Sequence, residues 1–315
     1  MVRQVYICAA GHSGSTLLDL LLGSHSQVES LGEIRHLPKN IALNTQCSCG
    51  APVRSCEFWR PVVADLGAQL KRDLLVEPYA LRAGYPRAVT LVDRQRQTRR
   101  YLLSRKILHG LAYLELSREW HFIHPLTGFL RKGVEHRLLI YEAVRRFAGV
   151  SLVVDSSKSY LEATSLYCGC PDETRIILLT RDGRGVMYSN IKMKLGRKRG
   201  LYGWTNYYLR ALPLLAQRVS SSHVLPVRYE DLVEDPGSEL ARICGFLGLE
   251  YEASMLDFSS HAHHVTNGND MRFASSSDIR VDASWRANLT PDDFSYFDRH
   301  AGSLNRRLGY PEGIS

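Results

Sequence analysis

Residues 4–16, with the sequence QVYICAAGHSGST, decide the fold of this chain. Residues 4–9 form a short apolar run rich in β-formers, which predicts a buried strand. A turn of glycine, histidine and serine follows, and residues 17–22 (LLDLLL) have a helical composition. A strand, a glycine-rich turn and a helix in this order gather backbone N–H groups at the positive end of a helix dipole, which predicts a site for an anion.

The turn at residues 11–16, here called the anion loop, contains the first group of predicted binding residues. Hydroxyl groups of its serine and threonine side chains can add hydrogen bonds to those of the backbone. The ATP-binding loop of P-loop proteins carries a Gly-Lys pair before Ser or Thr, and the anion loop has no such lysine. We therefore expect it to bind phosphate but not ATP with Mg²⁺, and a purely structural turn is the alternative. The predicted binding residues are Gly11, His12, Ser13, Gly14, Ser15 and Thr16.

Buried strands alternate with helices along the rest of the chain. This alternation predicts an α/β fold of three layers, in which helices flank a mostly parallel sheet, similar to that of P-loop proteins. We expect a single domain over residues 1–315, with a helical insertion at about 77–148 and a loop at 259–278. The further predicted strands are 151–155, 174–180 and 224–227, and the predicted helices are 62–75, 91–113, 134–148, 184–194 and 239–247.

The composition favours a globular protein that binds an anion. Of the 315 residues, 44% are hydrophobic and 23% are charged, which excludes collagen, a coiled coil and low-complexity disorder. Forty Lys and Arg residues outnumber 32 Asp and Glu residues, and the net charge of +8 favours phosphates, nucleic acid or an acidic surface as partners. The basic stretch at 87–106 either forms the solvated face of helices or contacts an anionic ligand.

The seven cysteines are expected to be reduced thiols. The sequence has no run of about 18 apolar residues and no signal-peptide pattern at its start, so we expect no membrane span and a cytoplasmic location. Disulfides are rare in that compartment. Cys47, Cys49 and Cys56 lie close together in the sequence, but zinc sites favour C-x₂₋₄-C spacing and this cluster begins with C-x-C. Structural thiols are therefore favoured over a metal, and no metal is predicted.

Polar residues at two strand ends form a second group of candidates. Arg181 follows the strand at 174–180, and Ser189 follows eight residues later in the next helix, so the two side chains could hold one phosphate from two sides. The alternative is an Arg181 that is neutralised by a carboxylate such as Asp182. Lys158 follows the strand at 151–155, where it either faces the same crevice or is exposed. Glu33 is either a base near these cations or a surface carboxylate.

Together these segments resemble the sulfotransferase family, whose members take a sulfuryl group from 3′-phosphoadenosine 5′-phosphosulfate (PAPS). Residues 11–17 (GHSGSTL) resemble the family's 5′-phosphosulfate loop, and Arg181 with Ser189 matches its 3′-phosphate motif. Residues 227–236 (VRYEDLVEDP) are similar to a later segment whose tyrosine, here Tyr229, contacts the nucleotide. Residues 285–286 (WR) resemble the family's C-terminal Trp-Lys segment.

The segment at 32–35 (GEIR) is similar to one in tyrosylprotein sulfotransferases, which implies that Glu33 is the catalytic base. The small-molecule branch uses a histidine after Lys-x instead, and Lys158 is followed here by Ser and Tyr, which supports Glu33. Residues 275–280 resemble a late donor-binding segment, which implies donor contacts for Ser276 and Arg280. His12 stands where the family usually has Lys or Arg.

The resemblance implies in-line transfer of a sulfuryl group from PAPS to an acceptor hydroxyl, with Glu33, Lys158 and His12 as catalytic residues and no metal. The acceptor could be a carbohydrate, a glycolipid, a natural product or a peptide, and the helical insertion would lie on its side of the site. A P-loop nucleotide kinase or NTPase is one alternative. A basic nucleic-acid-binding protein is another, although no helix-turn-helix, zinc-finger or RRM signature is present, so we expect no nucleic acid.

Overall fold

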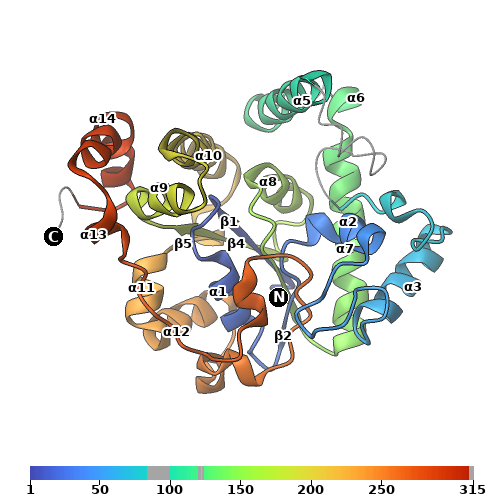
Figure 1. Cartoon of the computed structure of the whole chain (residues 1–315). Coiled ribbons are helices and arrows are strands. Elements are labelled where there is room, and N and C mark those ends of the chain that lie inside the picture. Colours follow the sequence, from blue (N-terminus) through green and yellow to red (C-terminus); the bar gives the residue numbers. More distant parts are fainter. Residues whose placement is uncertain (84–98, 120–121, 123, 312–315) are drawn as a thin grey trace.

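The structure is a computed structural model that describes residues 1–83, 99–119, 122 and 124–311 (Figure 1). At its centre lies a five-stranded sheet in the order β2-β3-β1-β4-β5, and each pair of neighbouring strands is parallel. The prediction of an α/β fold with a mostly parallel sheet is confirmed. The strands are β1 (Gln4–Ala9), β2 (Val28–Ser30), β3 (Leu152–Asp155), β4 (Thr174–Thr180) and β5 (Val224–Arg228).

Helices connect the strands and continue after the last of them. None of the helices within the described ranges is both long and apolar enough to cross a membrane. The helices are α1 (Ser15–Leu22), α2 (Leu37–Leu43), α3 (Trp59–Leu70), α5 (Arg99–Arg118), α6 (His124–Thr127), α7 (Phe129–Ala148), α8 (Tyr160–Gly169), α9 (Gly183–Lys192), α10 (Arg197–Arg218), α11 (Tyr229–Glu234), α12 (Pro236–Leu247), α13 (Trp285–Asn288) and α14 (Pro291–Arg307).

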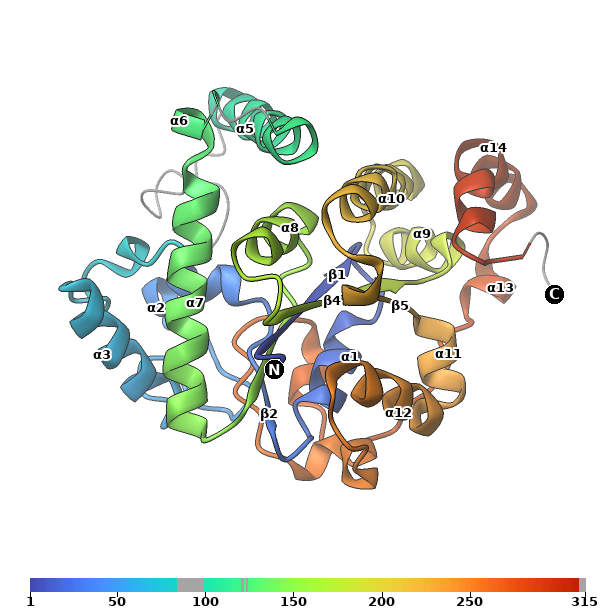
Figure 2. The same ribbon diagram turned by 180° about the vertical axis from the view of Figure 1, so that it is seen from behind.

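The sheet is covered on both faces, which makes three layers. Helices α8, α9 and α10 lie on one side of the sheet, and α1, α11 and α12 lie on the other (Figures 1 and 2). Side chains of β1 alternate between the two sides. Tyr6 and Cys8 pack in the core under α8 and α10, whereas Val5 and Ile7 pack in the core with α1 and α12. Burial on both faces explains why β1 and β4 read as continuous apolar runs.

The carboxyl ends of the parallel strands lie at one edge of the sheet, where open α/β sheets bind ligands. The anion loop directly follows β1 at this edge. Lys158 lies three residues after β3, Arg181 directly follows β4, and Tyr229 directly follows β5. The topology therefore brings together candidates that are far apart in the sequence.

The extents of two predicted helices differ from the observed ones. The helix predicted at 62–75 is α3, which ends at Leu70 because Lys71 takes a left-handed conformation with φ of 52°. The helix predicted at 91–113 overlaps α5, and residues 84–98 lie outside the described residues. Most of the basic stretch at 87–106 therefore has no structural description here.

Candidate active site

The anion loop has the backbone geometry of an anion site. Gly14 precedes α1 with φ of 85°, and no side chain caps the start of this helix, so its first N–H groups face the loop. A Cβ atom on Gly14 would lie 2.3 Å from Cδ2 of Tyr229. Ser13, Ser15 and Thr16 are buried beneath the loop. The structure thus places the predicted Tyr229 directly against the anion loop.

His12 adopts a left-handed backbone conformation, with φ of 64°, at the exposed tip of the loop. Its carbonyl oxygen accepts a hydrogen bond of 3.1 Å from Nη1 of Arg181. Burial, together with the charges of Lys158 and Arg181, lowers the pKa of the His12 imidazole. A lowered pKa means that His12 is neutral at pH 7, so it offers an N–H group rather than a positive charge.

Arg181 is buried between the anion loop and the C-terminal part of the chain. Its guanidinium stacks on the ring of Tyr229, with 4.5 Å from Cζ to the ring centroid. Its Nη2 atom donates to the carboxylate of Asp282 at 3.1 Å. The alternative partner considered from the sequence, Asp182, instead binds Arg184, with 2.6 Å between Nη2 and Oδ2. A carboxylate therefore does pair with Arg181, as the alternative held, but it is Asp282 and not Asp182, and the sequence did not single out Asp282.

Ser189 lies one turn after Gly185 on α9 and donates a hydrogen bond to the Gly185 carbonyl at 3.0 Å. A Cβ atom on Gly185 would lie 3.2 Å from Cδ1 of Trp285 and 3.3 Å from Nε of Arg181. The absence of a side chain at Gly185 therefore allows α9, Arg181 and the indole of Trp285 to approach one another closely.

Glu33 and Lys158 form a half-buried ion pair. Nζ of Lys158 lies 2.7 Å from Oε1 of Glu33, and Nε2 of His36 lies 3.5 Å from Oε2. Burial alone would raise the pKa of Glu33, but the hydrogen bond from His36 and the charge of Lys158 outweigh it and lower this pKa to about 2. Glu33 is thus ionised throughout the neutral range, as a base must be before it accepts a proton.

A buried polar network supports the turn that carries Lys158. Arg137 of α7 is 1% exposed and pairs with the carboxylates of Asp155 and Glu162. Asp155 accepts a hydrogen bond of 2.8 Å from the backbone N–H of Ser157, and the Ser157 hydroxyl accepts one of 3.1 Å from the backbone N–H of Arg35. This network fixes the ends of the Glu33 and Lys158 segments relative to each other. Along the sequence, only Asp155 at the end of a buried apolar run indicates this network.

The loop that precedes the predicted donor-binding segment 275–280 contacts the anion loop, whereas the predicted Ser276 and Arg280 do not. The backbone N–H of Asn269 donates to Oγ1 of Thr16 at 3.4 Å, and a Cβ atom on Gly268 would lie 3.3 Å from the same oxygen. Ser276 is exposed, and the Arg280 side chain is 83% exposed and pairs with Asp278.

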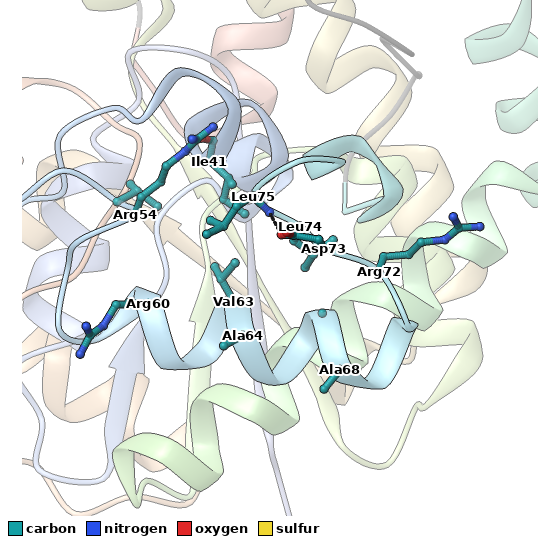
Figure 3. A pocket seen from close by; sticks show the side chains of 12 residues that line it. Ile41, Arg54, Arg60, Val63, Ala64, Ala68, Arg72, Asp73, Leu74 and Leu75 are labelled. Carbon is teal, nitrogen blue, oxygen red and sulfur yellow. Dashed lines mark hydrogen bonds between the residues drawn. The ribbon is translucent and has the colours of Figure 1, made fainter.

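A pocket of about 420 Å³ lies along α3, away from these residues (Figure 3). Its wall is apolar, and arginines stand around it. All of its lining residues come from residues 41–75, so neither the anion loop nor Lys158 contributes to it. The residues that Figure 3 labels are Ile41, Arg54, Arg60, Val63, Ala64, Ala68, Arg72, Asp73, Leu74 and Leu75.

The fold and the site define a class of enzyme. Its members have a P-loop-like nucleotide-binding fold, and the anion loop of this chain lacks the lysine that ATP-binding loops carry. Within this class the chain belongs to the sulfotransferase family, because residues 4–253 match the family model described as "Sulfotransferase family". The enzyme therefore transfers sulfuryl groups, and neither a kinase nor a nucleic-acid-binding protein is favoured. No curated protein matches the chain.

Among solved structures, the chain is similar to sulfotransferases and sulfotransferase domains. The sulfotransferase domain of the Synechococcus PCC 7002 olefin synthase is 21% identical, with a TM-score of 0.56, and the match covers 99% of this chain and 96% of that domain. The sulfotransferase domain from the curacin biosynthetic pathway is 18% identical, with a TM-score of 0.49 and 99% coverage of both chains. Sulfotransferase STF1 from Mycobacterium tuberculosis H37Rv is 15% identical, with a TM-score of 0.45, and the match covers 81% of this chain and 70% of that one.

Proposed function

We propose that this sulfotransferase uses PAPS as its donor, as family membership implies, and that Glu33 is the base that activates an acceptor hydroxyl. The observation that carries the proposal is the contact of 2.7 Å between Glu33 and Lys158 at the edge of the sheet that bears the anion loop and Arg181. A carboxylate with an adjacent cation supplies the base and the charge stabilisation that sulfuryl transfer needs.

The residues at this edge fit an adenosine 3′,5′-bisphosphate group. The N–H groups of the anion loop and the start of α1 suit the 5′-phosphate. Arg181, with Ser189 and the room left by Gly185, suits the 3′-phosphate. Asp282 holds the guanidinium in place at 3.1 Å, while the other terminal nitrogen of the guanidinium contacts the His12 carbonyl of the anion loop. Ser276 and Arg280 are further proposed donor contacts. For them to reach the nucleotide, their exposed segment would have to fold over it.

Lys158 has a dual role in this proposal. Bound PAPS would supply the sulfuryl group: the acceptor oxygen would bond to its sulfur as the bond from sulfur to the 5′-phosphate oxygen breaks, and Glu33 would take the acceptor proton. Lys158 then turns from Glu33 toward the phosphate oxygens, and the neutral His12 donates its N–H group to the same charge. Because Lys158 lowers the pKa of Glu33, its departure makes the carboxylate a stronger base at the time when the acceptor hydroxyl must lose its proton.

The acceptor is proposed to lie against an aromatic wall formed where α5, α8 and α10 meet. Nε2 of His109 and the hydroxyl of Tyr160 are 2.8 Å apart, and the rings of Tyr160 and Tyr207 pack edge to face at 5.3 Å. The Tyr207 hydroxyl donates to the Lys158 carbonyl at 2.7 Å, so the wall begins beside the proposed catalytic lysine. His109 and Tyr207 are partly exposed in this wall and Tyr160 is buried behind them, so a carbohydrate, a glycolipid, a natural product or a peptide would contact the first two rings.

Three further parts of the proposal follow from the same reading. The transfer step uses no metal, because the cationic side chains and loop N–H groups stabilise the developing charge. The net charge of +8 serves a small anion and not a nucleic acid. The proposed location of the enzyme is the cytoplasm. Fractionation of the cells that produce it tests this location.

Glu33→Gln tests the base directly. The amide cannot accept the acceptor proton, so turnover with labelled PAPS is expected to fall by about 10²–10⁴-fold, while binding of adenosine 3′,5′-bisphosphate stays the same in calorimetry. Glu142→Gln on α7, a half-exposed carboxylate that pairs with Arg3 and Arg145, is the matched control and keeps wild-type turnover. Wild-type turnover in Glu33→Gln would show that another group is the base.

Arg181→Ala tests the 3′-phosphate assignment. Loss of the guanidinium is expected to weaken binding of adenosine 3′,5′-bisphosphate by about 100-fold, the loss of a charged hydrogen-bonded contact, and to weaken AMP much less. Arg242→Ala on α12, which removes an ion pair with Glu239, is the control for the loss of one positive charge. Equal losses for the two nucleotides would remove the assignment.

A further inference from the structure

We propose that Cys47, Cys49, Cys56 and His264, here called the cysteine cluster, bind a structural zinc ion that holds the segment after His264 against the anion loop. The spacing of the cysteines had favoured reduced thiols without metal. The fold adds His264 as the fourth ligand. It lies 208 positions after Cys56, so the local spacing of the cysteines cannot indicate it.

Three of the separations between the ligand atoms are close to the edges of a zinc tetrahedron. All four lie within 4.8 Å of one another. The Sγ atoms of Cys49 and Cys56 are 3.6 Å apart, and Nδ1 of His264 lies 3.4 Å from Sγ of Cys56 and 3.9 Å from Sγ of Cys47. Bonds of about 2.3 Å to sulfur and 2.0 Å to nitrogen give tetrahedral edges of about 3.8 Å and 3.5 Å. A disulfide would need about 2.05 Å between the sulfurs.

A tight turn explains how the C-x-C pair can supply two ligands. The backbone N–H of Gly50 donates to the Cys47 carbonyl at 2.9 Å, and Gly50 takes the left-handed conformation with φ of 89°. This turn brings Cys47 and Cys49 to the same side of the loop.

Packing and hydrogen bonds fix the histidine ligand. The ring of Phe58 stacks on the His264 imidazole, with centroids 4.6 Å apart and planes 5° from parallel. Nε1 of Trp59 donates to the His264 carbonyl at 2.6 Å. The Ser48 hydroxyl donates to the His263 carbonyl at 2.5 Å, so the loop between the first two cysteines also holds the segment that carries His264. Such supporting contacts are typical of metal sites.

The charge balance near the cluster also favours a metal. Three thiolates, a neutral histidine and Zn²⁺ together carry a charge of about −1. Arg272 lies within electrostatic range of Cys47, and its buried Nε and Nη1 atoms have no hydrogen-bond partner in the part of the chain that the structure describes. Asp270 also acts on Arg272, and a zinc cluster with this net charge would add a second negative neighbour that three protonated thiols would not supply.

The proposed ion would stabilise the segment after His264, which contacts both the Glu33 turn and the anion loop. Asn40 of α2 donates to the Thr266 carbonyl at 3.1 Å, and a Cβ atom on Gly32, next to Glu33, would lie 2.5 Å from Cγ1 of Val265. Asn269 then contacts Thr16 of the anion loop. The zinc would thus anchor the start of a segment that packs against both the Glu33 turn and the anion loop.

Metal analysis of the full chain tests the proposal. Protein purified without a metal-affinity step is expected to contain about one zinc per chain by mass spectrometry of the elements. Protein produced with Co²⁺ as the replacement metal is expected to show thiolate-to-cobalt charge-transfer bands and the visible bands of tetrahedral cobalt.

Variants separate the cluster from the other thiols. Cys49→Ser, at the exposed ligand, and His264→Gln are expected to lower zinc content at least about tenfold. Cys168→Ser, an exposed cysteine outside the cluster, leaves it unchanged. A folded wild-type chain that contains no zinc, and in which alkylation modifies all three cysteines of the cluster, would overturn the proposal. A Cys49–Cys56 disulfide found by peptide mapping would also overturn it. These readouts do not depend on sulfuryl transfer, so they are independent of the role proposed for Glu33.

Discussion

Gly14 shows how one position can set the shape of the whole donor site. It combines φ of 85° with a Cβ direction that points at the ring of Tyr229, only 2.3 Å away. The same ring carries the guanidinium of Arg181 on its surface. A side chain at Gly14 would therefore displace Tyr229 and, through it, the group that we assign to the 3′-phosphate.

Gly14→Ala is expected to destabilise the enzyme by at least about 1–2 kcal/mol, the cost of a left-handed conformation for an L-residue, and to weaken binding of adenosine 3′,5′-bisphosphate. Gly245→Ala on α12 is the matched change, because nothing lies within 4 Å of its Cβ position and its helix favours alanine. Urea unfolding should show opposite shifts for the two variants. A Gly14→Ala variant as stable as wild type would mean that Tyr229 yields without cost.

The sequence could identify the residues of the site more readily than their partners. Arg181 and Lys158 follow strand ends, as predicted, because a buried apolar run before each of them indicates a strand. The partner of Arg181 could not be predicted, because Asp282 lies 101 residues further along the chain and Asp182 is its direct neighbour. Contacts of this kind depend on the packing of distant loops.

At the scale of elements, the neighbouring α1 and β2 each carry a carboxyl group whose pKa is raised. Asp19 of α1 is 1% exposed, and burial raises its pKa to about 7. Burial and the charge of Asp19 raise the pKa of Glu29 in β2 to about 8. Unfolded carboxyls titrate near pH 4, so between about pH 4 and 7 the folded state keeps protons that the unfolded state has lost. The free energy of unfolding therefore falls as pH rises.

Asp19→Asn should remove part of this pH dependence, since the amide does not titrate. The fall in the free energy of unfolding between pH 5 and pH 8 is expected to be about 2–3 kcal/mol smaller than in wild type. Denaturant unfolding at the two pH values measures it. Asp65→Asn on α3, a 41% exposed carboxylate, should keep the wild-type slope. The same slope in Asp19→Asn would show that the buried carboxylate is already ionised.

The elements that the sequence predicted are those with a strong local pattern. β1, β3, β4 and β5 are short runs between turn signals, and α7 has clear amphipathic spacing. β2 has three residues, too few for any pattern. Helix α10 carries two glycines and an internal proline, Pro213, which oppose helix formation. Buried Trp204 and Tyr208 hold it in place, and such tertiary packing is not visible along the sequence.

At the scale of the whole molecule, the proposed donor site is built from both halves of the chain. The anion loop comes from the first strand, whereas Asp282 and Trp285 come from the last part of the chain. A ligand that contacts both should stabilise the molecule as a unit, because it binds the folded state and not the unfolded one.

Adenosine 3′,5′-bisphosphate is therefore expected to raise the melting temperature of wild-type enzyme by several degrees at 100 times its dissociation constant, which corresponds to about 2.7 kcal/mol. Glu33→Gln should show the same rise at the same nucleotide concentration, and Arg181→Ala should show little. Differential scanning calorimetry measures the shift. An equal rise in wild type and Arg181→Ala would place the nucleotide elsewhere.

The position of β1 in the sheet also governs how the chain must fold on the ribosome. β1 is synthesised first, yet it is the central strand, and its partners Val153 and Thr174 follow Gln4 by about 150 and 170 residues. At roughly 5–20 residues per second, this apolar strand waits about 10 s or more before either neighbour exists. During that interval its exposed edges and the adjoining anion loop depend on chaperones or on provisional contacts with early helices such as α1.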